Sequence, residues 1–253
     1  MMNETSKHIK KRNYVDEGSG EPIILLYGLF GSVNNFRFLV DHLKKNYRVI
    51  VPVFPFYEMG FTVTIFSLTK FLHELTLDLK LDKFHLMGNS MGGHIALLYI
   101  LEHPERVESL TLSGSSGLFE NGMGDSFPKR KEYDYIKKKT EITFYKPETA
   151  TKELVDEIYA IVNSRKALHI LSLAKSTIRN NVEKELHRIQ APCLLVWGKQ
   201  DVVTPPQVAH DFKRLIPHAE LHWIDECGHV PMLETPEKFN EIIDHFLEKV
   251  PIR

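Results

Sequence analysis

Three residues with the chemical types needed for nucleophilic catalysis stand close to the ends of apolar segments: Ser90, Asp201 and His229. A serine hydroxyl becomes an effective nucleophile when a histidine accepts its proton and a carboxylate orients that histidine. The sequence therefore predicts a catalytic serine with its base and acid. The alternatives are that Asp201 is a solvated turn residue and that His229 is a structural histidine.

The segment around Ser90 reads GNSMG, from Gly88 to Gly92. It joins an apolar run, Phe84 to Met87, to an apolar helical pattern that begins at Met91. So tight a strand-to-helix turn forces its central residue into strained backbone geometry and exposes Ser90 Oγ, while glycines allow neighbouring backbone to approach. The positive end of the helix suits a reaction that develops an oxyanion. The alternative is a glycine-rich turn that only packs a helix on a strand.

The predicted acid and base each follow a predicted strand. Asp201 comes after the apolar run Cys193 to Trp197, in a turn closed by a Thr-Pro-Pro sequence. His229 follows the alternating segment Glu220 to Ile224. We expect Gly228 to allow an unusual backbone angle beside His229.

Short apolar runs bounded by turn residues alternate with helical patterns along the chain, which predicts an α/β fold with a mostly parallel central sheet and helices on both faces. The other predicted strands are Ile23–Tyr27, Tyr47–Val53 and Val107–Leu112, with a short one around His8–Val15. The predicted helices are Phe66–Leu79, Met91–Leu101, Pro206–Leu215 and Pro236–Lys249, the last with Thr235 as N-cap.

One long segment, residues 114–190, interrupts this alternation. It contains no convincing core strand, but helical patterns occur at Glu153–Val162 and Ala167–Ile178. A segment of this length in a compact domain needs structure of its own. We therefore expect a core domain of residues 1–113 and 191–253, with a helical cap insertion at 114–190.

Four stretches resemble the α/β-hydrolase superfamily: LLYGLFGS, LMGNSMGG, LLVWGKQDVVTP and CGHVPMLETPEKF. The resemblance covers Ile23 to Leu247 apart from the insertion. It implies the α/β-hydrolase fold, with Ser90 as nucleophile, Asp201 as acid and His229 as base. The insertion corresponds to the helical cap that walls the substrate pocket in this superfamily.

The resemblance also implies an oxyanion hole made of two backbone N–H groups. One belongs to Met91, and matching by position gives Leu29 as the second donor, with Phe30 as the alternative. Many relatives have His-Gly in this loop where the present chain has Tyr27 and Gly28. A backbone donor does not depend on the missing histidine, so we keep the role.

Four residues are predicted to contact substrate: Phe30, Asn35, Phe56 and Val230. Phe56 lies in VFPFYE, where relatives often read D-x-P-G-x-G. The aromatic content of this loop either shapes substrate choice or serves local packing, and the sequence leaves both open.

The resemblance favours hydrolysis of a small-molecule carboxylic ester, thioester or lactone through an acyl-enzyme. GNSMGG with Asn35 also resembles hydrolases that cleave carbon–carbon bonds in ring-cleavage products, but those usually carry a tryptophan soon after the histidine. Here Val-Pro-Met follows His229, as in esterase-like members. Carbon–carbon cleavage and a small-molecule receptor of the same fold stay open as alternatives. Ser90 argues against dehalogenases and epoxide hydrolases, which use aspartate.

Composition narrows the expected partners. The net charge of −1 gives no global field for nucleic acid or an anionic membrane. We find no signal-peptide pattern and no long apolar run, and the two cysteines argue against a disulfide framework, so we expect a cytoplasmic protein. His218 and His222 are four residues apart but lack the glutamate of a helical metal motif. We expect no metal or cofactor, a small-molecule substrate, and a monomer or homodimer.

Overall fold

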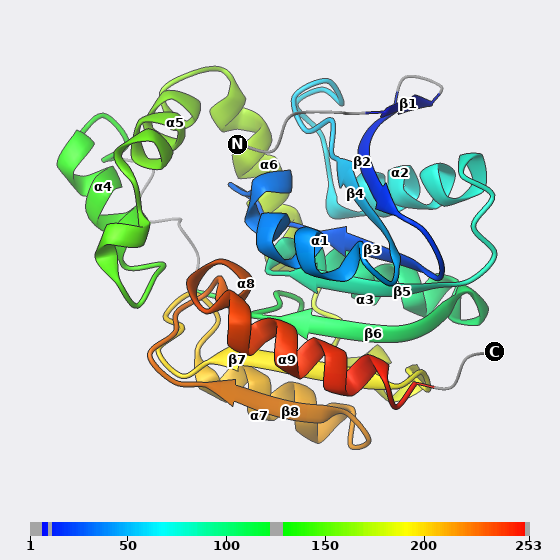
Figure 1. The fold of residues 1–253 in the computed structure, drawn as a ribbon. Coiled ribbons are helices and arrows are strands. Elements are labelled where there is room, and N and C mark those ends of the chain that lie inside the picture. Colours follow the sequence, from blue (N-terminus) through cyan, green and yellow to red (C-terminus); the bar gives the residue numbers. More distant parts are fainter. Residues whose placement is uncertain (1–6, 10–11, 122–128, 251–253) are drawn as a thin grey trace.

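A computed structural model describes residues 7–9, 12–121 and 129–250 of the chain. Its strands form one sheet in the order β1-β2-β4-β3-β5-β6-β7-β8, in which β1–β2 and β2–β4 pair antiparallel and the other neighbours pair parallel (Figure 1). The strands are β1 (Lys7–Ile9), β2 (Arg12–Gly18), β3 (Pro22–Leu26), β4 (Arg48–Val53), β5 (Phe84–Asn89), β6 (Val107–Ser113), β7 (Cys193–Gly198) and β8 (Glu220–Ile224).

The centre of the sheet is buried on both faces. Every residue of β5 and β7 is buried, which explains why these strands read as continuous apolar runs in the sequence. Helices α1, α8 and α9 cover one face, and α2, α3 and α7 cover the other (Figure 1). These helices are α1 (Arg37–Leu43), α2 (Ile65–Asp78), α3 (Met91–Glu102), α7 (Pro206–Leu215), α8 (Pro231–Glu234) and α9 (Pro236–Leu247), with 3₁₀ turns at Val33–Phe36 and Pro104–Arg106.

Between β6 and β7 the described residues form helices and no strand. These are α4 (Tyr133–Glu141), α5 (Lys152–Val162) and α6 (Lys166–Arg179), with 3₁₀ turns at Pro147–Thr149 and Glu183–Arg188. Helices α4 to α6 lie beyond the end of the sheet toward which the parallel strands point (Figure 1). The helical character of the insertion is confirmed for the described residues, and its boundaries at 114 and 190 stay a prediction.

The structure departs from the sequence-based expectations in three places. The N-terminal segment forms a hairpin, β1 and β2, instead of one strand. Helices α1, α4 and α8 were not predicted. Thr235 occupies the N-cap position of α9, but its side chain makes no cap hydrogen bond, since its hydroxyl donates to Pro231 O at 3.2 Å. No helix in the described part of the chain is long and apolar enough to span a bilayer.

Candidate active site

Ser90 occupies the sharp turn between β5 and α3. Its backbone has φ 56° and ψ −126°, a strained conformation for a residue with a side chain. The Ser90 N–H donates to Ser113 O at 3.1 Å, and the Ser90 carbonyl accepts the Ser116 N–H at 3.1 Å. Two hydrogen bonds to the chain just after β6 therefore hold the strained residue in place.

The glycines on either side of Ser90 are required by close backbone contacts. A Cβ on Gly88 would lie 2.3 Å from Gly92 O, and a Cβ on Gly92 would lie 2.1 Å from Leu26 O. Any side chain at either position would displace the start of α3 from β3 and β5. The predicted close approach of backbone at this turn is confirmed.

Asp201 and His229 form a buried hydrogen-bonded pair. His229 Nδ1 lies 2.9 Å from Asp201 Oδ2, and the two residues are 5% and 2% exposed. Asp201 Oδ1 accepts the N–H groups of Val203 and Thr204 at 2.8 and 3.0 Å. The Thr204 hydroxyl donates to Asp201 Oδ2 at 2.8 Å. The turn after β7 thus fixes the carboxylate that faces the imidazole. Among the described residues, His229 Nε2 has no hydrogen-bond partner.

The pKa of His229 is raised by its surroundings. Burial is the largest single influence and lowers the pKa. The charge of Asp201 and its hydrogen bond raise the pKa, as do Glu120 and Glu234 to a smaller extent, and together they outweigh burial. The net effect favours a positively charged imidazole. A histidine that accepts a proton during a reaction benefits from this arrangement.

Two residues that the sequence did not single out complete the support of this pair. A Cβ on Gly114 would lie 3.0 Å from both Asp201 Oδ2 and His229 Nδ1, and Gly114 has φ +49°. Asn89 donates its side-chain N–H₂ to His229 O at 3.0 Å and to Ser113 O at 2.9 Å. In the sequence, Gly114 is marked only by its place directly after the predicted strand that becomes β6.

The loop after β3 lies against Ser90. A Cβ on Gly28 would be 3.2 Å from Ser90 Oγ, and Gly28 O accepts the Gly31 N–H at 3.0 Å, which closes a tight turn. Within the described residues, the N–H groups of Leu29, Phe30 and Met91 have no hydrogen-bond acceptor. Binding of an oxyanion by any of these N–H groups, and the choice of Met91 with Leu29, stays a prediction.

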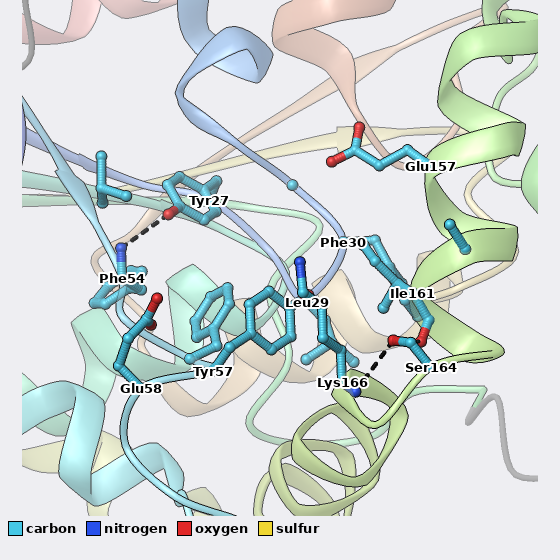
Figure 2. Close-up of a pocket in the computed structure, with 14 residues that line it drawn as sticks. Tyr27, Leu29, Phe30, Phe54, Tyr57, Glu58, Glu157, Ile161, Ser164 and Lys166 are labelled. Atoms are coloured by element: carbon cyan, nitrogen blue, oxygen red, sulfur yellow. Dashed lines mark hydrogen bonds between the residues drawn. The ribbon is translucent and has the colours of Figure 1, made fainter.

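A cavity of about 490 Å³ opens beside this loop. It is lined by residues 29–31, by the loop after β4, and by α5 with the turn that follows it. In Figure 2, Tyr27, Phe54 and Glu58 lie opposite Glu157 and Ile161 of α5. Ser90, Asp201 and His229 are not part of its lining, so the cavity lies beside the loop that touches Ser90 and does not contain the Asp–His pair.

Residues 21–141 and 125–236 match the family described as the alpha/beta hydrolase fold. The chain belongs to the α/β-hydrolase family. Its relatives include the 2-hydroxy-6-oxononadienedioate/2-hydroxy-6-oxononatrienedioate hydrolase of Comamonas testosteroni, 30% identical over 92% of this chain and 89% of that protein. Lipase 1 of Psychrobacter immobilis is 28% identical over 89% of this chain and 77% of that protein.

Solved structures agree with this assignment. The α/β-hydrolase MGS-MChE2, from a metagenome of sediments of the Mar Chica lagoon in Morocco, is 37% identical, with a TM-score of 0.80 over 96% of this chain and 98% of that one. A putative lipase of Acinetobacter baumannii is 26% identical, with a TM-score of 0.83 over 97% and 91%. The expected fold and the expectation of a hydrolase are confirmed.

The four predicted substrate contacts of this α/β-hydrolase fall into two groups. Phe30 and Phe56 line the cavity. Asn35 accepts the Ser32 N–H at 3.0 Å in the cap of a 3₁₀ turn, and buried Val230 does not reach the cavity lining. Substrate contact by any of the four stays a prediction.

The expected role of Gly228 is wrong. Its φ does not lie in the left-handed region, whereas the neighbouring Glu226 has φ 51°. Gly228 is needed because a Cβ there would lie 2.6 Å from Thr143 O and 2.9 Å from Tyr145 N. The sequence could not show this, because the contact comes from the insertion.

Other titratable side chains lie buried in this α/β-hydrolase. Burial raises the pKa of Cys227 to about 12, and both cysteines are buried and free, so a packed thiol is the simplest description. His94, four residues after Ser90, is fully buried, with neither ring nitrogen hydrogen-bonded within the described part of the chain. No cluster of three or more potential metal ligands occurs among the described residues.

Proposed function

We propose that this α/β-hydrolase cleaves small, uncharged carboxylic esters through an acyl-enzyme on Ser90. The observation that carries the proposal is the buried Asp201–His229 pair, 2.9 Å apart, joined through Gly114 and Asn89 to the turn that holds Ser90. Thioesters and lactones share the same chemistry and belong to the same proposal.

In the proposed reaction, His229 Nε2 accepts the Ser90 proton as Oγ attacks the substrate carbonyl. Asp201 holds the other ring nitrogen and stabilises the charged imidazole. The N–H groups of Met91 and Leu29 bind the oxyanion, and loss of one such donor typically costs ~10²–10³ in rate. Water activated by His229 then releases the acid and regenerates Ser90.

The lining of the cavity supports an uncharged substrate. Phe54 and Phe56 stack with ring centroids 5.6 Å apart, which gives an apolar surface. Glu58 and Glu157 add two carboxylates, and Lys166, with Nζ 4.5 Å from the Tyr57 ring centroid, adds one ammonium group. A dianionic substrate would meet net negative charge in this cavity.

Carbon–carbon bond hydrolysis is the second candidate. It is supported by the Comamonas testosteroni relative, whose name specifies dienedioates that carry two carboxylates. A receptor role, in which a ligand is bound with slow or no turnover, is the third. Stalled turnover after one burst, together with ligand-dependent capture of a partner protein, would favour that role.

The test is hydrolysis of p-nitrophenyl esters from acetate to long-chain acyl groups, beside a 2-hydroxy-6-oxo-dienedioate, with the wild type and Ser90→Ala. The proposal predicts serine-dependent multiple turnover of esters, with a chain-length optimum, and a much lower kcat/KM for the dienedioate. Faster turnover of the dienedioate than of every ester would replace ester hydrolysis by carbon–carbon cleavage.

We further propose that residues 114–190 act as a cap over the cavity and that the protein works in the cytoplasm as a monomer or homodimer. Helix α5 lines the cavity, which supports the cap. Cys193 and Cys227 are both free thiols, which supports a reducing compartment. Light scattering on the purified chain and fractionation of cells test the oligomeric state and the compartment.

A further inference from the structure

Glu234 holds the backbone on both sides of His229. It ends α8, five residues after the histidine. Its carboxylate accepts the Gly228 N–H, at 3.1 Å to each oxygen, and the Val230 N–H at 3.1 Å. The residues before and after His229 are therefore bound to one side chain, while Asn89 holds the His229 carbonyl.

The same carboxylate binds the insertion. Glu234 Oε2 accepts the Tyr145 N–H at 2.8 Å, from the segment between α4 and α5. In return, the His229 N–H donates to Thr143 O at 2.9 Å. Gly228 packs directly on this segment, since a Cβ there would overlap Thr143 O. Residues 143–145 and 228–234 thus form one hydrogen-bonded contact, which we name the histidine–insertion contact.

We propose that Glu234 is a positioning residue for His229 and that it couples the insertion to the imidazole through the histidine–insertion contact. The inference rests on the proposed function, in which His229 is the general base. The chemical reason for a carboxylate at this position is the number of donors, because three N–H groups converge on the two oxygens of Glu234. A carboxylate offers only acceptors there, whereas a glutamine of the same size would turn an N–H₂ group toward an N–H.

The charge of Glu234 gives a second, separable effect. The acidic groups that act on His229 are Asp201, Glu120 and Glu234, all of which raise its pKa. Removal of one of these charges should lower the pKa of His229. A residue that only stabilised the loop would change thermal stability without moving this titration.

The experiment compares Glu234→Gln with Glu237→Gln, an exposed glutamate in the first turn of α9. We expect Glu234→Gln to lower kcat for the best ester ten- to hundredfold, because a small displacement of a reacting group costs up to ~10²-fold in rate. We also expect the acid limb of kcat/KM to move to lower pH, because the substitution removes a negative charge that raises the pKa of His229. Glu237→Gln should match the wild type. An unchanged kcat together with an unchanged acid limb in Glu234→Gln would overturn the proposal.

Two further measurements keep the test decisive. If Glu234→Gln does not fold, Glu234→Asp replaces it in the test. The shorter carboxylate should lower kcat at least threefold and leave the midpoint of the acid limb unchanged. A kcat equal to that of the wild type would overturn the proposal. If the protein hydrolyses no ester, NMR titration of the His229 ring tests the effect of the Glu234 charge: the midpoint should fall in Glu234→Gln and match the wild type in Glu237→Gln, and an unchanged midpoint in Glu234→Gln would overturn the proposal. Activity that survives Ser90→Ala would contradict only the proposed function.

Discussion

Gly28 lies directly against Ser90: a Cβ on Gly28 would stand 2.9 Å from Ser90 Cβ and 3.2 Å from Ser90 Oγ. The loop proposed to supply an oxyanion donor therefore touches the proposed nucleophile. Gly28 also closes the turn through Gly31, so a displacement of Ser90 toward the loop would disturb that turn. In the proposed reaction, this contact would link the direction of attack to the position of the donors.

Gly28→Ala should reduce kcat at least tenfold, because the added methyl group displaces either Ser90 Oγ or the Leu29 N–H. Overpacking at such a buried contact typically costs about 1–3 kcal/mol of stability. Steady-state kinetics and urea unfolding measure the two effects. Gly60→Ala is the control, since Gly60 has φ +80° with nothing within 4 Å of a Cβ, and should lose stability but not kcat. Equal kcat values for Gly28→Ala and the wild type would contradict the contact.

The acid limb of kcat/KM should have its midpoint above about 6.5, the usual pKa of histidine. His229 must be neutral to accept a proton, and its pKa is raised because Asp201 outweighs burial. Activity should therefore fall as pH decreases through the raised pKa. Asp201→Asn should lower both the rate and this midpoint. A midpoint below 6 in the wild type would contradict the account of the pair.

His94 should make the folded state sensitive to acid. Burial lowers the pKa of His94 to about 4, whereas an unfolded histidine titrates near 6.5. Between these values the unfolded chain binds a proton that the folded chain does not, so stability falls as pH decreases. The full difference amounts to about 3 kcal/mol.

The measurement for His94 is urea unfolding of the wild type and His94→Leu at pH 7 and pH 4.5. The variant should lose less stability between these two values than the wild type does. His229 contributes in the opposite direction in both proteins, since its raised pKa stabilises the folded state in acid and this contribution is lost as pH rises through that pKa. It therefore cancels in the comparison. Parallel curves for the two proteins would exclude His94 as an acid-sensitive group.

The Tyr27 hydroxyl accepts the Phe54 N–H at 2.9 Å. Tyr27→Phe should leave that buried N–H unpaired, at a cost of about 1–3 kcal/mol. Because Phe54 and Phe56 line the cavity, KM should rise more than kcat falls. Burial raises the pKa of Tyr27 to about 12, so the effect should not depend on pH between 6 and 9. A fall in kcat at constant KM would contradict this role.

The sequence predicted the candidate site residues that stand in short recognisable stretches. Ser90 and Asp201 each follow a buried strand, and His229 follows the partly exposed edge strand β8. The parallel strand order brings the ends of these strands to the same edge of the sheet. Three helices were missed for different reasons. Helices α1 and α8 have only seven and four residues, and α4 is mostly polar with two buried side chains, so none has a strong apolar period.

The supporting residues were not predictable, because their contacts join distant parts of the chain. A side chain at position 114 would crowd Asp201 and His229, and a side chain at position 228 would overlap Thr143 of the insertion. Glu234 lies in the stretch CGHVPMLETPEKF, but nothing in that stretch shows that its carboxylate, at the end of α8, binds three backbone N–H groups. Such requirements arise from tertiary packing, which no local pattern of residues records.

The most direct test of the central claim is peptide mapping by mass spectrometry after rapid acid quenching of the protein with a p-nitrophenyl ester. The account predicts an acyl group on Ser90, in an amount that matches the burst of p-nitrophenol, and no adduct in Ser90→Ala. Turnover of the same ester without an adduct on Ser90, or with undiminished rate in Ser90→Ala, would contradict it.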